Sequence, residues 1–104
     1  MNKIKNYIAG SWIEGDGEEL VAENAINGAA IGTVSSAGLD YAAMLDYGRS
    51  KGGPALRKMT FQERGRMLKA LALHLMSIKK KFYELSAATG ATKTDSWIDI
   101  EGGI

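Results

Sequence analysis

The chain has 104 residues, with 13 Lys and Arg against 12 Asp and Glu, and so carries a formal net charge of +1. This length allows one domain at most, and the balanced charge gives no electrostatic argument for binding nucleic acid or an anionic membrane. The N-terminus lacks the apolar core of a signal peptide, and the chain has neither cysteine nor a long apolar run. We therefore expect a cytoplasmic protein.

The first part of the chain predicts short strands and turns. Asn6 to Ile13 (NYIAGSWI) indicates a hairpin in which Gly10 supplies a positive φ. Glu19 to Glu23 can extend as a strand, and Asn27-Gly28 is a strong hairpin signal before a further strand at Ala30 to Ser35. We expect these strands to form a small antiparallel sheet of three or four members.

A helix is predicted next, from about Leu39 to Lys51. Gly52-Gly53-Pro54 should stop this helix, because proline lacks an amide hydrogen and its ring clashes with the preceding turn. The residues from Ala55 to Met59 would then form a tight connector.

The longest periodic stretch runs from Met59 to Thr94. Thr60 followed three residues later by Glu63 is a capping box, so a helix should begin at Phe61. A single helix to Thr89 would exceed the usual globular length, and we expect a break near Ser77 to Lys79. Apolar residues recur at steps of three and four and keep one face apolar: Phe61, Leu68, Leu71, Ala72, Leu75, Ile78, Phe82 and Leu85.

The C-terminal part predicts one more helix. Gly90 lies where a left-handed residue would close the preceding helix, and a new helix should start near Thr94 or Asp95. Ile104 lies within one or two turns of that start. The predicted fold class is therefore α+β, with strands and turns over residues 1–36 followed by three to four helices over residues 39–104.

Two glycine-rich or basic motifs have a structural interpretation. Gly15-Asp16-Gly17 begins like a phosphate-binding loop but lacks the third glycine, the preceding buried strand and the following helix, so it is interpreted as a turn. The run Lys79-Lys80-Lys81 is interpreted as a solvated helix face. His74, the single histidine, has no cysteine or second histidine to complete a metal site, and is interpreted as structural.

The carboxylates and tryptophans are interpreted in the same way. Asp95, Asp99 and Glu101 cluster in sequence and could in principle perform acid and base chemistry, but no pocket accompanies them, which favours capping and solvation. Trp12 and Trp97 are expected to anchor against helices, because large rings bury much area. No catalytic, cofactor-binding or metal-binding residue is predicted from these patterns.

Several motifs together resemble the N-terminus of the aldehyde dehydrogenase superfamily. The most general are I-x-G-x-W (Ile8, Gly10, Trp12) and E-R-G-x-x-L (Glu63, Arg64, Gly65, Leu68). KGGPALRKMTF, ATGATKTDSW and DIEGGI are most similar to the aldehyde dehydrogenase half of the bifunctional ring-opening enzymes of bacterial phenylacetate degradation. Many members have Asn-Pro-x-x-Gly where this chain has Asn24-Ala25-Ile26-Asn27-Gly28, so the proline is missing here.

The resemblance implies a part of an enzyme rather than a whole one. Such enzymes oxidise an aldehyde with NAD or NADP through a thiohemiacetal on a cysteine, with a glutamate as base. This chain has no cysteine and stops before the family's nucleotide-binding sheet, so residues 1–104 are expected to be one N-terminal structural segment, inactive alone and binding no cofactor. The resemblance implies only possible substrate-entrance positions, Gly102 and Gly103, in the parent.

The predicted partners follow from the apolar helix face. In the parent enzyme the remainder of the protein would cover this face. In the isolated chain we expect a homo-oligomer through Phe61, Leu68, Leu75 and Phe82, because large exposed apolar patches favour association. Two alternatives stay open: a free-standing oligomerising interaction module, and a small ligand-binding regulatory protein with a pocket between helices.

Overall fold

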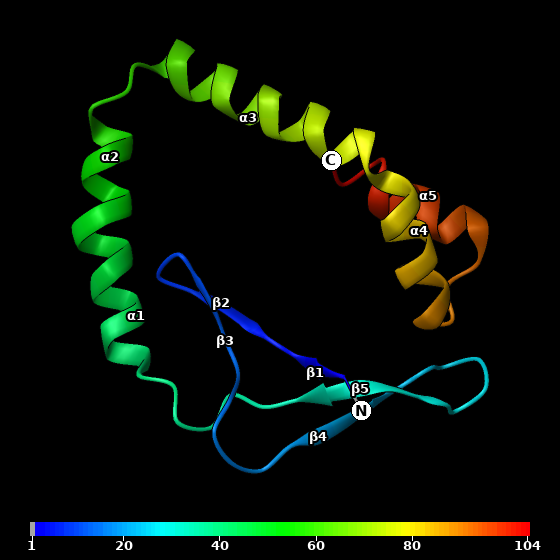
Figure 1. Cartoon of the computed structure of the whole chain (residues 1–104). Coiled ribbons are helices and arrows are strands. Elements are labelled where there is room, and N and C mark those ends of the chain that lie inside the picture. Colours follow the sequence, from blue (N-terminus) through cyan, green and yellow to red (C-terminus); the bar gives the residue numbers. More distant parts are fainter. Residues whose placement is uncertain (1) are drawn as a thin grey trace. The chain divides into compact units, whose positions relative to one another are not determined.

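The computed structural model describes residues 2–104, which form two compact units. The first unit holds residues 2–23 and 29–59, and the second holds residues 24–28 and 60–104. Short strands occur in the first unit, and helices occur in both (Figure 1). The predicted α+β class is confirmed.

Strands β2 (Asn6–Ile8) and β3 (Ser11–Ile13) form the predicted hairpin. Both turn residues have positive φ, 49° at Ala9 and 85° at Gly10, as the tight turn between twisted strands requires. Trp12 pairs with Tyr7 across the hairpin, with ring centroids 5.0 Å apart. The expectation that Trp12 packs against a helix is wrong, since its side chain contacts Tyr7 and is 67% exposed.

The other strands form a second small sheet in the order β1-β5-β4. Strands β4 (Leu20–Glu23) and β5 (Ala30–Val34) make the predicted antiparallel pair, while β1 (Lys3–Ile4) pairs parallel with β5. The strands therefore divide between two sheets, and the single all-antiparallel sheet expected from the sequence is not formed. Gly32 is buried in β5, where a Cβ would lie 2.6 Å from the Asn2 carbonyl oxygen, so β1 can approach only a glycine at this point.

The predicted stop at Gly52-Gly53-Pro54 is wrong. Helix α1 (Tyr41–Tyr47) continues through the π-helical segment η1 (Gly48–Gly52) into α2 (Gly53–Arg57) (Figure 1). Within η1 the Gly53 amide donates to the Gly48 carbonyl, five residues back. This wider turn places Pro54 at the start of α2, where a missing amide hydrogen and a fixed φ are tolerated.

The central stretch follows its prediction closely. Helix α3 (Phe61–Ser77) begins with the capping box, in which the Glu63 amide donates to Thr60 Oγ1 (3.1 Å) and the Thr60 amide donates to Glu63 Oε2 (2.7 Å). Ile78 leaves helical geometry, with φ −112° and ψ 12°, and helix α4 (Lys79–Ala88) begins directly after it. Gly90 has φ 85° after α4, as expected. Helix α5 (Lys93–Ile100) starts one or two residues earlier than predicted, because Thr92 caps it.

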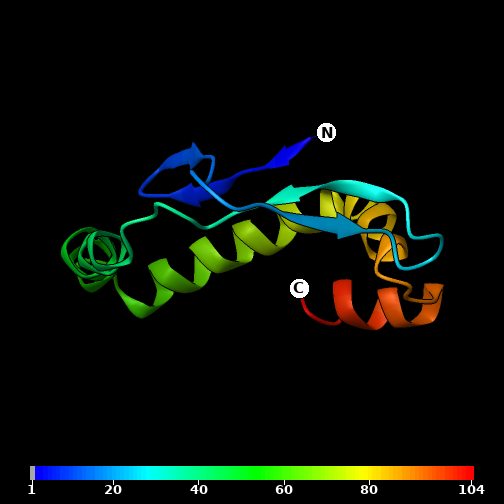
Figure 2. The same cartoon turned by 90° about the horizontal axis from the view of Figure 1, so that it is seen from below.

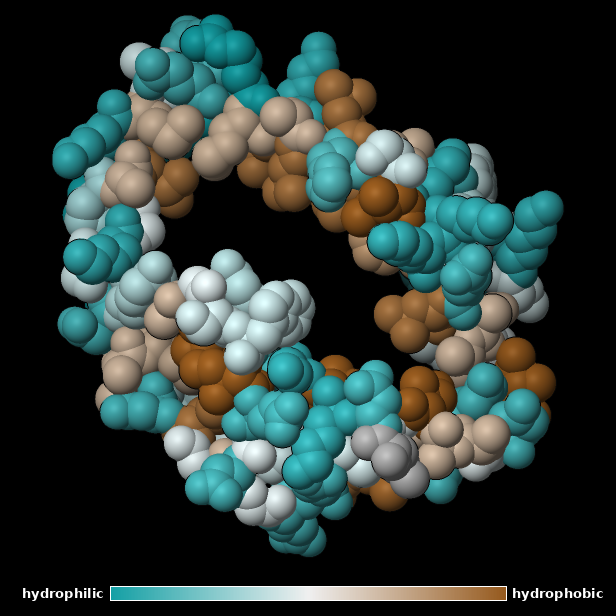
Figure 3. Space-filling view, in the orientation of Figure 1, coloured by the Kyte–Doolittle hydropathy of each residue, from teal (hydrophilic) through white to brown (hydrophobic). Residues whose placement is uncertain are grey.

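Apolar side chains remain largely accessible in both units. Among residues 2–104 no hydrophobic side chain is buried, and the buried polar side chain is that of Ser96. On α3, Phe61 is 82% exposed, and hydrophobic residues are visible along this helix (Figure 3). The helices are thus formed by local signals, such as caps and periodicity, without a closed hydrophobic core around them.

The capping box gives a direct test of how α3 is held. Replacing Thr60 by Ala removes the acceptor of the Glu63 amide and should destabilise the helix by about 1 kcal/mol. Thr60→Ser keeps a hydroxyl oxygen and should retain most of that stability. Helix content of the two variants, measured by far-UV circular dichroism against temperature, checks this. Equal melting of the Ala and Ser variants would contradict the capping role.

Candidate functional site

Helices α4 and α5 are joined by a polar cluster, named here the α4–α5 clasp. Glu101, which follows α5, accepts from Lys79 Nζ through Oε1 (2.7 Å) and from the Tyr83 hydroxyl through Oε2 (2.5 Å). Ser86 Oγ and Ser96 Oγ lie 2.8 Å apart in a second hydrogen bond between the same helices. Figures 1 and 2 both show α4 and α5 next to each other near the C-terminus. These contacts fix the pairing of the two helices.

The helical period explains why the clasp residues face α5. Lys79 and Tyr83 are four residues apart on α4 and so lie on one face. Thr92 begins α5 by accepting from the Asp95 amide (3.2 Å) and donating to Asp95 Oδ2 (2.8 Å). The turn at Gly90 and the cap at Thr92 therefore bring α5 back along α4, which puts Glu101 beside Lys79.

The clasp raises the pKa of Tyr83 and lowers the pKa of Glu101. The hydrogen bond to Glu101, followed by burial and the carboxylate charge, raises the pKa of Tyr83 to about 12. The hydrogen bond from Lys79, followed by that from Tyr83, lowers the pKa of Glu101 below its ordinary value. The pairing should hold across neutral pH. It weakens as pH falls through the lowered pKa of Glu101, and it weakens as pH rises toward 12.

The turn after Glu101 contains the two predicted entrance positions. A Cβ on Gly102 would overlap the carbonyl oxygen of Ile98, and a Cβ on Gly103 would overlap that of Asp99. Both positions therefore require glycine if this backbone is kept. Gly103 lines a groove and Gly102 is not among the residues that line it. A role of either residue at a substrate entrance stays a prediction.

Within residues 2–104, three open grooves lie along α4 and α5, and the two larger ones differ in their lining. The first, named here the C-terminal groove, has a volume of about 520 Å³ and an apolar lining of Leu75, Phe82, Leu85, Ile100 and Ile104. The second has a volume of about 620 Å³ and is lined by lysines and small residues: Lys79, Lys80, Tyr83, Ala87, Ala91, Lys93 and Ser96. Both grooves offer a mainly apolar surface, and the second also carries three lysines.

The three carboxylates that lie close together in sequence have separate surroundings in the structure. The Asp95 carboxylate accepts from the hydroxyl of Thr92, the cap of α5, while Asp99 borders the C-terminal groove and Glu101 belongs to the clasp. His74 is exposed on α3. Within residues 2–104, no group of three or more His, Asp or Glu side chains is placed to hold a metal ion. The arrangement supports packing between helices rather than acid and base chemistry.

The basic run and Trp97 differ in part from their interpretations. Lys80 and Lys81 are exposed, as a solvated face requires, but Lys79 forms the ion pair with Glu101. Trp97 is 57% exposed and lines a groove with Tyr83 and Lys93, so it is not the buried anchor that was expected. The sequence indicated the face of α4 but not the partner of Lys79, which lies 22 residues away.

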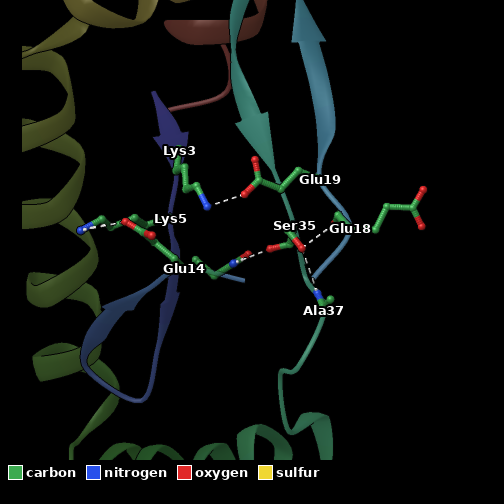
Figure 4. Close-up of polar contacts among 8 residues, drawn as sticks. Lys3, Lys5, Glu14, Glu18, Glu19, Ser35 and Ala37 are labelled. Atoms are coloured by element: carbon green, nitrogen blue, oxygen red, sulfur yellow. Dashed lines mark hydrogen bonds and ion pairs between the residues drawn. The ribbon is translucent and has the colours of Figure 1, made fainter. Parts of the chain in front are cut away.

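The first unit holds a separate set of polar contacts (Figure 4). Lys3 Nζ lies 2.5 Å from Glu19 Oε1, and this contact raises the pKa of Lys3 and lowers the pKa of Glu19. Ser35 Oγ donates to the Glu18 carbonyl (2.7 Å) and accepts from the Ala37 amide (3.3 Å). These contacts join strands and loops of the sheet.

The Gly15-Asp16-Gly17 segment lies in an irregular loop with a bend at Gly17. The Asp16 amide donates to the Ala37 carbonyl (2.8 Å), and the segment connects β3 to β4 without a following helix. A phosphate-binding loop needs a helix N-terminus behind it.

No helix among residues 2–104 has both the length and the apolar character needed to cross a bilayer.

Comparison with known proteins adds the family context. No family model matches the chain. The chain is, however, similar over nearly its whole length to an aldehyde dehydrogenase, which confirms the resemblance expected from its motifs. That relative is the 3,4-dehydroadipyl-CoA semialdehyde dehydrogenase of Aromatoleum evansii, 38% identical over 103 residues. The match covers 98% of this chain and 20% of the relative, so the chain spans about a fifth of the relative's length.

The raised pKa of Tyr83 provides a test of the clasp. Replacing Glu101 by Gln removes the carboxylate and should return the Tyr83 pKa from about 12 toward the ordinary 10.0. Tyrosinate absorbance during an alkaline titration measures this, with Tyr83→Phe identifying the late-titrating component. Glu84→Gln, which removes the same charge from an exposed position on α4, is the control and should leave the titration unchanged. An unshifted late component in Glu101→Gln would refute the clasp.

Proposed function

We propose that this chain is the N-terminal structural portion of an NAD(P)-dependent aldehyde dehydrogenase that resembles the semialdehyde dehydrogenase of phenylacetate degradation. The observation that carries the proposal is the match covering 98% of this chain but 20% of a semialdehyde dehydrogenase. The accessible apolar side chains of both units support it, since a structural portion would bury them against the rest of the enzyme. We expect the complete protein to be cytoplasmic.

The chemistry of aldehyde oxidation indicates which part of the proposed enzyme would carry the catalytic residues. Aldehyde oxidation through a thiohemiacetal needs a thiolate, and this chain has no cysteine. The nucleophile, the general base and the site for NAD or NADP would therefore lie in the remaining part of the enzyme. A semialdehyde attached to coenzyme A is the substrate that the relative's name states. We propose a semialdehyde as the substrate class of the complete protein.

The first experiment on this proposal is an activity assay of the purified chain. No reduction of NAD or NADP should occur with any aldehyde, including a semialdehyde, because no residue of the chain can form the covalent intermediate. Cofactor absorbance at 340 nm is the readout, with the full-length relative as a positive control. Turnover by a preparation free of full-length enzyme would contradict the proposal. The coding sequence beyond Ile104 provides an independent check, because it should continue into a nucleotide-binding region and a later cysteine.

A second candidate is a free-standing module that assembles through its helices. The observation that favours it is the exposed apolar face of α3, where Phe61 and Leu68 are both more than half exposed. An exposed apolar face of this kind is covered in most stable proteins. In this candidate a second copy of the chain would cover it.

Self-association of the isolated chain is expected in either case. A dimer or larger oligomer should form through Phe61, Leu68, Leu75 and Phe82, and the double variant Phe61→Asp/Leu68→Asp should be monomeric. Light scattering at several concentrations measures the mass, and Lys80→Asp, an exposed substitution on α4, is the matched control. A monomer that unfolds cooperatively would argue against both the oligomer and its proposed surface.

A further inference from the structure

We infer that the C-terminal groove is the docking site for an apolar segment from the remaining part of the same polypeptide. The inference rests on the proposed function and adds to it the surface that receives the rest of the enzyme. The groove is formed within the second unit by the end of α3, one face of α4, and α5 with the residues that follow it.

The lining of the groove defines the chemistry of its occupant. Leu75, Phe82 and Leu85 project from α3 and α4, and Ile100 and Ile104 complete the apolar surface. The volume of about 520 Å³ lies within the range of pockets that bury a ligand or several side chains. Asp99 is the charged residue at this groove, so it suits an apolar segment with a cation or hydrogen-bond donor opposite that carboxylate. The groove lined by Lys79, Lys80 and Lys93 carries three cationic side chains, whereas the C-terminal groove carries a single carboxylate.

Leu85 shows that the groove is unfilled. Its side chain is 62% exposed although it belongs to the predicted apolar face, of which it is the last residue. A leucine in that environment gains free energy on burial, because apolar area leaves water. An apolar side chain inserted between Leu85 and Ile100 would supply that burial.

The remainder of the polypeptide fits the groove better than a second copy does. About four-fifths of the relative lies outside the matched region. Under the proposed function the polypeptide continues from Ile104, which itself lines the groove, so a following segment is held close to it. A tethered segment has an effective concentration of roughly millimolar for a short linker, whereas a second copy must associate from solution.

A chimera tests the inference. The chain replaces the matched fifth of the Aromatoleum evansii relative, and Leu85→Lys is introduced to place a charge in the groove. The control is Leu73→Lys, because Leu73 is 63% exposed on α3 and does not line the groove. The unfolding temperature of each chimera is measured, together with its dehydrogenase activity.

We expect Leu85→Lys to lower the unfolding temperature by at least about 3 °C relative to the Leu73→Lys chimera, because a charge would be buried without a partner. Equal unfolding temperatures in an active, folded chimera would overturn the groove assignment and leave the proposed function intact. An unsubstituted chimera that is neither folded nor active would overturn both. If Leu85→Lys abolishes self-association of the isolated chain but leaves the chimera unchanged, the occupant is a second copy and the inference is wrong.

Discussion

The structure depends on one constraint: its apolar side chains have no closed core to enter. No hydrophobic side chain among residues 2–104 is buried, although 45% of the sequence is hydrophobic. Burial of apolar area is the dominant favourable contribution to folding, and ordering each backbone residue costs about 1–2 kcal/mol. Isolated helices of 8–17 residues are marginal in water on their own. Residues 2–104 therefore do not supply the burial that their apolar side chains would need.

Within this constraint, local hydrogen bonds and ion pairs determine the geometry. The capping box at Thr60 sets the start of α3, and the α4–α5 clasp sets the pairing of the last two helices. The clasp is compatible with a structural role, since its carboxylate is neutralised by Lys79 and its tyrosine stays protonated at neutral pH. The polar contacts thus position apolar faces, and a covering partner would supply the burial.

Local features were readable from the sequence, and contacts between distant residues were not. The hairpin at Gly10, the start of α3, the break at Ile78 and the end of α4 at Gly90 each depend on a few neighbouring residues, and each was predicted. The helix end predicted at Pro54 was wrong because the π-helical turn before it accommodates proline. The parallel pairing of β1 with β5 and the contact of Lys79 with Glu101 join residues far apart, and no local pattern marks either. The aldehyde dehydrogenase motifs supplied what the physical pattern could not.

The stability of the isolated chain at low concentration tests the central claim most directly. Thermal unfolding followed by far-UV circular dichroism at micromolar concentration should be broad and should sharpen as concentration rises, because the missing partner surface is then supplied only by association. A sharp transition whose midpoint does not change with concentration would contradict the claim. It would show that residues 2–104 contain a complete cooperative core and need no further polypeptide.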